Sequence, residues 1–427
     1  MFIPAKLLPM KMKLPFLSKT NKTDNEVLLA LDVGTEFVKA VIFTVEEGDT
    51  SIKVLGYGRS RQHGSAMKGA MVINIDHVVN ACDRAIGEAL NHADEIMSKE
   101  LGVEYVTPAP EKVLLGIAGE LVKGVTIIAD YSREEPDVKI EQREIDEVIT
   151  SIKEYSFNQA INDISEETGI ETKRLQEINS KINATYIDGV QVDRPLGMTG
   201  ENISYRVFST FAPSLHLNSL KEIASQLGLE ILTIEVEPYA IARAVKDAKS
   251  EKFSAVIIDI GGGTTDIAVI ERGSVIATKM FAYGGKVFTK RISNKLKVQI
   301  EDAEKIKVDY SNGAVNETQA RAIREMLTKD CLVWAQGVEL SLSEIEDIDS
   351  YPTVFYLCGG GSGLPEIKES LQEYAWLQTL PFAKHPKIEY LYPKQLEDIN
   401  DVSRSITGPE DIAPLALARM YFELDKK

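Results

Sequence analysis

The sequence predicts an α/β protein made of two related halves, with a small α+β module inserted into the first half. Two observations support this fold class. A pattern of apolar strand, glycine turn and apolar strand near the N-terminus returns after residue 250, which indicates an internal repeat. Between the two copies, from about residue 110 to 212, the pattern changes to short strands around one polar helix.

The first half begins near residue 26. VLLALDV and FVKAVIFTV predict two strands on either side of Gly34, and SIKVLGYGRS predicts a third. Apolar residues then recur at helical spacing from Val78 to Met97, with Asn74 or Asp76 as the expected N-cap. This order predicts a sheet covered by one long helix.

The inserted module follows a break at TPAP. EKVLLGIAG, GVTIIAD, INATYIDGVQV and NISYRVFSTFAP predict its strands, and a polar helix begins at REIDEVITSIKEYSF. The helix SLKEIASQLG and the strand EILTIEVEP then resume the first half. The charged stretch KDAKSEK marks the junction. We therefore expect a tail at 1–25, a first lobe at 26–109 and 213–250, the module at 110–212, and a second lobe at 251–427.

Composition limits the possible functions. The 427 residues are 44% hydrophobic and 26% charged, as in soluble globular proteins. The net charge of −17 argues against nucleic acid as a partner, because phosphate backbones attract basic surfaces. The three cysteines form no CxxC pair, which favours a reducing compartment, and the five histidines show no zinc-ligand spacing. There is no apolar run of about 18 residues to span a membrane.

The internal repeat carries most of the functional argument. ALDVGTEFVKAVIF aligns without a gap on IDIGGGTTDIAVI when Asp32 is placed on Asp259. Gly34 then matches Gly261, and Lys39 matches Asp266. A third glycine turn, in VFYLCGGGSGLPEIKESL, leads from a strand into a helix that begins near Pro365.

The glycine turns have a simple structural explanation and a chemical one. A tight hairpin needs one or two glycines, so a lone GGG is weak evidence for a ligand. Glycines also allow backbone N–H groups to approach phosphate oxygens closely. Asp32 and Asp259 would then hold magnesium through water, and Lys39 would neutralise phosphate charge. Two matched hairpins and a third glycine turn favour a phosphate site over an ordinary hairpin.

The same motifs resemble a known superfamily. LALDVGTEFVKAVI and VIIDIGGGTTDIAV resemble the two phosphate loops of the actin-like ATPases, and LCGGGSGLPEI resembles their adenosine motif. EVEPYAIARAV and GPEDIAPLALARMY resemble their two connecting helices. Within the superfamily, KGAMVINIDHVVNACDRAI, the insert with PLGMTG, and GGKVFTKRISNKLKVQIEDAEKIKVDYSNG are similar to the bacterial FtsA cell-division proteins. The resemblance covers roughly residues 27–422.

This resemblance implies a two-lobed, actin-like (ribonuclease-H-like) ATPase fold with an FtsA-type inserted α+β subdomain, and a smaller subdomain at about 290–350 in the second lobe. It implies ATP and Mg²⁺ as ligands. Asp32 and Asp259 would flank the metal, and Glu237 would orient the attacking water. Asp266 would either help to orient the metal or form the polar face of its hairpin. The other implied nucleotide-binding residues are Gly34, Thr35, Lys39, Gly261, Gly262, Gly263, Thr264, Thr265, Glu304, Lys307, Gly360, Gly361 and Ser362.

Simpler explanations exist for some of these residues. Glu237 precedes a proline, and it could be an ordinary solvated charge in place of the residue that orients water. Glu304 and Lys307 lie three residues apart, so they share a helical face and have the alternative of an ordinary surface ion pair.

The resemblance also implies a role at the division site. Such a protein would polymerise, work with other division proteins, bind the C-terminal tail of FtsZ and lie on the cytoplasmic face of the membrane as, at most, a slow ATPase. FtsA proteins normally end in an amphipathic membrane helix, whereas this chain stops at FELDKK. The N-terminal segment MFIPAKLLPMKMKLPFLSKTNK has five lysines and no acid, so residues 1–22 are either a disordered tail or a replacement anchor on anionic lipid.

Three other functions remain open from sequence. A PilM-like adaptor of type IV pilus assembly shares the superfamily, and TIEVEPYAIARAV resembles it too, but the insert argues against it. A sugar kinase on the same fold would need a catalytic aspartate in a sugar pocket, for which the sequence offers no clear candidate. A scaffold without nucleotide is disfavoured, because the phosphate residues are intact.

Overall fold

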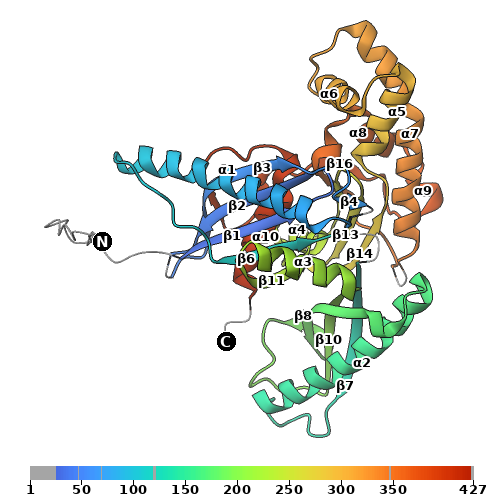
Figure 1. Ribbon diagram of the computed structural model, residues 1–427. Helices are drawn as coiled ribbons and strands as arrows, with labels where there is room; N and C mark the ends of the chain where they lie inside the picture. The colour runs from blue at the N-terminus through green and yellow to red at the C-terminus, as the bar shows by residue number, and fades with distance from the viewer. Residues whose placement is uncertain (1–25, 47, 69, 119–121, 346–347, 425–427) are drawn as a thin grey trace, which may run out of the picture.

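The computed structural model describes residues 26–46, 48–68, 70–118, 122–345 and 348–424. It has three parts (Figure 1). The first lobe, in blue and red, carries the long helix α1, and the second lobe, in yellow and orange, extends into an arm of α5, α6 and α7. The inserted module, in teal and green, lies below both lobes. The predicted N-terminal anchor at residues 1–22 lies outside the described residues.

The first lobe is built on a six-stranded mixed sheet. Its strands, in spatial order, are β11 (Glu230–Val236), β6 (Lys112–Ile117), β1 (Val27–Val33), β2 (Phe37–Thr44), β3 (Ile52–Arg61) and β17 (Ile399–Asp401). β1, β2 and β3 are antiparallel neighbours, whereas β6 runs parallel to both β1 and β11. The three predicted N-terminal strands are thus present, and the hairpin of the first repeat is the centre of the sheet.

Helix α1 (Ile75–Leu101) covers this sheet, and close packing explains its position. Asn74 is the N-cap, and its side chain accepts a hydrogen bond from the His77 N–H at 3.0 Å. A Cβ on Gly56 of β3 would lie 2.1 Å from the carbonyl oxygen of Ala89. Gly58 is as close to the helix backbone, so only glycines at these two positions let α1 lie directly on β3.

The second lobe and the module share one nine-stranded sheet. The second lobe contributes β16 (Lys387–Tyr390), β15 (Val354–Cys358), β12 (Ala255–Ile260), β13 (Thr265–Glu271) and β14 (Ser274–Phe281). The module continues the sheet with β7 (Lys123–Ser132), β10 (Asn202–Pro213), β8 (Leu175–Ile187) and β9 (Val190–Val192). The sheet passes from one part to the other where β14 pairs with β7, at Ala277–Val125 and Thr278–Gly124.

Helices cover both sheets. The remaining helices are α2 (Gln142–Thr168), α3 (Ser214–Gln226), α4 (Glu237–Ala244), α5 (Gly285–Leu296), α6 (Ile300–Ser311), α7 (Glu317–Ser343), α8 (Pro365–Glu373), α9 (Trp376–Thr379) and α10 (Ile412–Arg419), and β4 (Met67–Lys68) and β5 (Met71–Val72) form a small hairpin. One buried cluster joins the first sheet to α1, α4 and α10, and a second lies between β12–β13 and the arm helices. No helix among the described residues is both long and apolar enough to cross a membrane.

Two segments lie elsewhere than the sequence indicated. The strand β6 belongs to the first lobe, because it pairs with β1 and β11, and not to the inserted module that was expected to begin at residue 110. The C-terminal segment, expected in the second lobe, returns to the first. Its strand β17 pairs with β3, and Leu415 and Leu417 of α10 are fully buried in the first lobe's core. We therefore place the start of the module after Ile117 and the return to the first lobe near residue 399.

The strand β8 begins earlier than the sequence indicated, since its 13 residues start at Leu175 and not at Ile182. Two of the added polar side chains have partners in the first lobe: Asn179 and Lys181 both bind the buried carboxylate of Glu235, at 2.7 and 2.8 Å. These contacts explain why Asn179 and Lys181 are only partly exposed within a polar strand.

Candidate functional site

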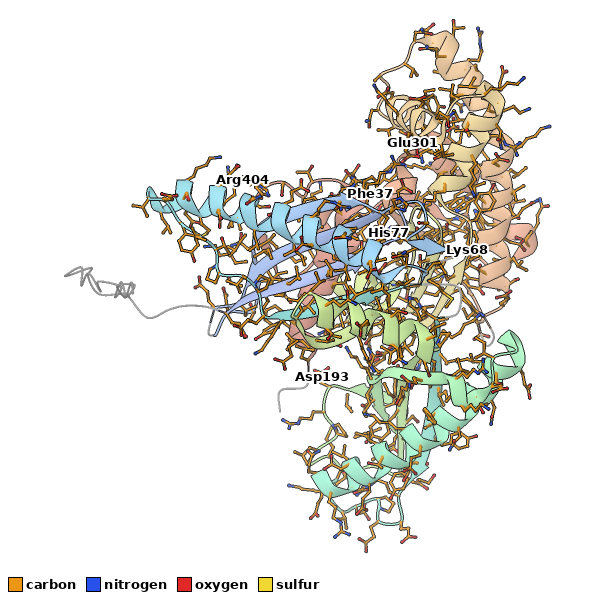
Figure 2. All side chains as sticks on the ribbon, viewed as in Figure 1. Phe37, Lys68, His77, Asp193, Glu301 and Arg404 are labelled. Atoms are coloured by element: carbon orange, nitrogen blue, oxygen red, sulfur yellow. The ribbon has the colours of Figure 1, made fainter. Side chains whose placement is uncertain are left out.

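The two repeats form equivalent hairpins. Asp32 lies opposite Lys39 in the β1–β2 pair, and Asp259 lies opposite Asp266 in the β12–β13 pair. The gap-free alignment of the sequence predicts this correspondence. Each hairpin turns through a glycine loop, which we call the first loop (residues 34–36) and the second loop (residues 261–264). Figure 2 places Phe37, which follows the first loop, at the end of the first sheet nearest the second lobe.

The two loops line one cleft of about 430 Å³, the size of a small-molecule site. Of the predicted site residues, the following line it: Asp32, Gly34, Thr35, Lys39, Glu237, Asp259, Gly261, Gly262, Thr264, Glu304, Lys307, Gly360, Gly361 and Ser362. These residues come from five separate stretches of both lobes. The fold therefore gathers most of the predicted residues in one place.

Two predicted residues have other surroundings. Thr265 is fully buried beneath the second loop, where its hydroxyl donates to Tyr283 O at 2.6 Å and accepts from Trp334 Nε1 at 2.8 Å. The prediction that Thr265 meets the ligand is therefore wrong. Thr264 is the last residue of the second loop and Thr265 is the first residue of β13, so the side chains of these neighbours point in opposite directions. Gly263 packs against the first loop, since a Cβ there would be 2.9 Å from Thr35 Oγ1.

The acids that line the cleft include Asp32, Glu237, Asp259 and Asp266. Burial raises the pKa of Asp259 to about 6, with Lys39 opposing the change. Burial, followed by the neighbouring carboxylates, raises the pKa of Glu237 well above its usual value, and burial does the same for Asp266. Such crowding of like charges away from water is costly unless a cation compensates it.

Lys39 lies among acids. Its ammonium is 3.8 Å from Asp32 Oδ2 and 3.7 Å from Asp411 Oδ1, and it donates a hydrogen bond to the carbonyl oxygen of Glu410. Burial lowers the pKa of Lys39, but the charges of Asp32 and Asp411 outweigh it and raise the pKa above the ordinary lysine value. Lys39 is therefore a permanent cation in the cleft.

Glu304 and Lys307 line the cleft from α6. Lys307 Nζ donates to Gly285 O at 3.1 Å, to Thr289 Oγ1 at 2.8 Å and to Glu304 Oε2 at 2.7 Å. Lys307 is almost fully buried, so these two residues are more than a solvated ion pair on a helix surface.

The third glycine loop (residues 359–363) also lines the cleft. Gly359 has φ +81°, and a Cβ there would be 2.0 Å from Asp259 Oδ1. Ser362 is buried and donates its hydroxyl to Gly359 O at 2.7 Å. The loop thus brings its backbone beside the aspartate of the second repeat, and Ser362 Oγ is engaged within the loop.

Sequence reasoning missed several cleft residues. Gly116 lines the cleft beside Glu237, since a Cβ on Gly116 would lie 2.6 Å from Glu237 Oε1. Asp411, the N-cap of α10, lies beside the cleft residue Lys39 and accepts a hydrogen bond from Tyr57 OH at 2.7 Å. The sequence around these two residues does not mark them, because only the fold brings Gly116 to the cleft and Asp411 to Lys39. Glu36 and Lys286 also line it.

Comparison with known proteins supports the resemblance seen in the motifs. The family model for cell division protein FtsA matches residues 256–405. Cell division protein FtsA of Neisseria meningitidis serogroup B is 30% identical over 287 residues, which are 66% of this chain and 60% of that protein. FtsA of Bacillus subtilis is 22% identical over 372 residues, 82% of this chain and 77% of that protein. The chain thus spans about three fifths of the Neisseria relative.

A solved structure confirms the fold class. The PilM–PilN type IV pilus biogenesis complex contains a chain that superimposes with a TM-score of 0.60 at 17% identity, covering 92% of this chain and 97% of its own. At this identity the likeness establishes the fold alone. The chain therefore has an actin-like α/β fold and is similar in sequence to the FtsA proteins, and this ATPase fold implies a nucleotide site.

Proposed function

We propose that this chain, which is similar in sequence to the FtsA proteins, is an ATP-binding, actin-like cell-division protein. It polymerises and links the FtsZ ring to the inner face of the cell membrane. The observation that supports the site is the pair of equivalent hairpins that line one cleft, each with a glycine loop and an aspartate. The relatives named cell division protein FtsA support the biological role.

The acidic end of the cleft fits ATP with Mg²⁺. Asp266 Oδ1 is buried without a hydrogen-bond partner, and three neighbouring acids have raised pKa values. No group of three or more His, Cys, Asp or Glu side chains in the described part of the chain is arranged to hold a metal directly. Asp32 and Asp259 would therefore hold Mg²⁺ through its water shell, which this ion retains readily. The metal would neutralise phosphate charge.

The remaining residues divide by position along the cleft. Backbone N–H groups of Gly34, Thr35 and residues 262–264 would meet the phosphates, together with the Lys39 ammonium, whereas the Gly261 N–H donates within the loop to Thr264 O at 2.9 Å. Glu304 and Lys307 would contact ribose and base, with Gly360, Gly361 and the backbone of Ser362 beside them. Thr265 would support the second loop from below and would not touch the nucleotide.

Hydrolysis by this site would be slow. Glu237 would orient the attacking water, but burial and nearby acids raise its pKa, which disfavours the ionised form that a general base needs. Mg²⁺ bound near Asp32 and Asp259 would lower that pKa by supplying positive charge. We therefore propose that ATP acts mainly as a ligand that shifts the lobes between conformations.

Nucleotide binding is the first test. The wild type, stripped of nucleotide, should bind ATP with Mg²⁺ and release γ-phosphate slowly, and Asp259→Ala should lose binding by at least about tenfold, equivalent to ~1.4 kcal/mol. Equal failure of the wild type and the variant to bind ATP would contradict the proposal.

The division role needs its own experiment. A C-terminal FtsZ peptide should bind the protein, and liposomes of anionic lipid should co-sediment with the full chain in ATP but not with a chain lacking residues 1–22. Self-assembly should be visible by light scattering under the same conditions. The PilM-like alternative makes the opposite prediction, namely binding of an N-terminal peptide from a pilus membrane protein and none of the FtsZ peptide.

A further inference from the structure

One residue touches both glycine loops. Lys286 is the second residue of α5, and its backbone N–H donates to Gly262 O of the second loop at 2.8 Å. Its side chain reaches the other lobe, where Nζ donates to Thr35 O at 2.8 Å and lies 3.0 Å from Glu36 Oε2. Lys286 thus connects the two loops across the cleft.

The first loop carries a carboxylate, Glu36, that faces the cleft where a phosphate would bind. Glu36 lines the cleft, and its side chain is 16% exposed. Its backbone packs closely on the second loop, since a Cβ on Gly262 would be 2.7 Å from Glu36 Cβ. Any phosphate held between the loops would therefore meet a nearby carboxylate, and like charges at such a distance repel.

Two cations compensate this carboxylate, and they come from different lobes. Arg61 Nε of β3 donates to Glu36 Oε1 at 2.8 Å, and Lys286 binds the other oxygen from the second lobe. Burial alone would raise the pKa of Glu36, but Lys286 and then Arg61 lower it overall, so the carboxylate is ionised. Lys286 therefore supplies one of the two cations that neutralise Glu36, and it also connects the first loop to the second.

We propose that Lys286 is an interlobe latch, which holds the first loop on the second and neutralises Glu36, and thereby sets the affinity of the cleft for a nucleoside triphosphate relative to a diphosphate. The inference rests on the proposed nucleotide site. The triphosphate is the more sensitive ligand, because its additional phosphate adds charge between the loops. Lys286 acts here as a positioning residue.

The test compares four proteins: wild type, Lys286→Met, Glu36→Gln and the double variant. Titration with fluorescent ATP and ADP should show that Lys286→Met weakens ATP binding about tenfold more than ADP binding, equivalent to ~1.4 kcal/mol. The double variant should recover the wild-type ratio to within about threefold, because the uncompensated acid is gone. Lys290→Met, at an exposed lysine one turn further along α5, is the matched control and should bind both nucleotides as the wild type does.

A second measurement does not need nucleotide. Hydrogen exchange of the ligand-free protein should show faster exchange at residues 34–37 and 261–264 in Lys286→Met than in the wild type and in Lys290→Met, while the core of α1 stays protected. Lys286→Arg should restore protection, since it keeps the charge. A Lys286→Met variant with unchanged exchange and an unchanged ATP-to-ADP ratio would overturn the latch. If the wild type binds no nucleotide, the proposed function fails, and the exchange result alone decides whether Lys286 holds the loops together.

Discussion

At the scale of single residues, Thr264 and Thr265 have different surroundings: Thr264 faces the cleft, and Thr265 supports the second loop from inside the lobe. Thr264 lines the cleft and donates to Asp266 Oδ2 at 3.1 Å, whereas Thr265 links Tyr283 O to Trp334 Nε1 inside the second lobe. The two side chains are chemically identical and adjacent. A substitution at each position therefore tests where the site ends.

Thr265→Val should lower the free energy of unfolding by about 1–3 kcal/mol, because the isosteric change leaves two buried polar groups without their partner. The nucleotide affinity of the folded variant should stay within about threefold of wild type, ~0.6 kcal/mol. Thr264→Val should show the reverse pattern, with weaker binding and a smaller loss of stability. Denaturant unfolding and nucleotide titration of both variants measure this, and weaker binding by Thr265→Val alone would place its hydroxyl in the site after all.

Local sequence predicted the residues that lie within the repeats, because the hairpins carry both the glycines and the aspartates. It could not predict the partners of Lys39. Asp411 and Glu410 lie more than 370 positions further along the chain and reach Lys39 only because α10 returns to the first lobe. Local sequence also misassigned Thr265. The direction of a side chain after a glycine loop depends on the residue at which the next strand begins, and β13 begins at Thr265.

At the scale of elements, the β14–β7 seam ties the module to the second lobe. A Cβ on Gly124 would lie 2.2 Å from Thr278 Oγ1 and 2.5 Å from the ring of Phe208. Glu235 of β11 ties β8 to the first lobe at the same time, through Lys181 and Asn179. The module therefore contacts both lobes through its strands, so its position should respond to any movement between them.

Gly124→Ala should destabilise the protein by about 1–3 kcal/mol, because the added methyl group forces the seam apart. Gly87→Ala is the matched control: Gly87 lies inside α1, its Cβ would meet nothing within 4 Å, and the change should stabilise by about 0.5–1 kcal/mol. Thermal unfolding ranks the variants, and hydrogen exchange should be faster at residues 275–278 only in Gly124→Ala. Equal protection of β14 in both variants would show that the seam does not hold the module.

Elements with a strong pattern in their own sequence were predictable, whereas elements whose placement depends on partners elsewhere in the chain were not. Helix α1 follows from its periodic apolar residues and its Asn74 cap. The C-terminal part of β8 lies in the predicted strand INATYIDGVQV, but its polar N-terminal part, Leu175–Lys181, does not follow from sequence, because Asn179 finds its partner on β11. The assignment of β6 fails for a related reason: its sequence predicts a strand, but only tertiary pairing decides which sheet receives it.

At the scale of the whole molecule, the cleft stores unfavourable charge that a bound cation and nucleotide would relieve. The pKa of Asp259 is about 6 in the folded protein, above its ordinary value of 3.8, because burial disfavours the charged form. The stabilising contribution of this group is therefore complete below about pH 4 and is lost as the pH rises through about 6. At neutral pH, the ligand-free fold carries an ionised carboxylate that it would be more stable without.

Asp259→Asn should consequently be more stable than the wild type at pH 7, by about 3 kcal/mol, and this advantage should vanish near pH 4. With ATP and Mg²⁺ most of the advantage at pH 7 should disappear, since a ligand at 100 times its Kd stabilises the wild type by about 2.7 kcal/mol and the variant would not bind it. Denaturant unfolding at pH 4, 5.5 and 7, with and without ligand, measures both effects. Asp83→Asn, on the exposed side of α1, is the control and should match the wild type throughout. A variant that parallels the wild type at every pH would mean that Asp259 is not a strained acid, whereas a neutral-pH advantage that persists in ATP and Mg²⁺ would mean that the cleft holds its ligand without this carboxylate.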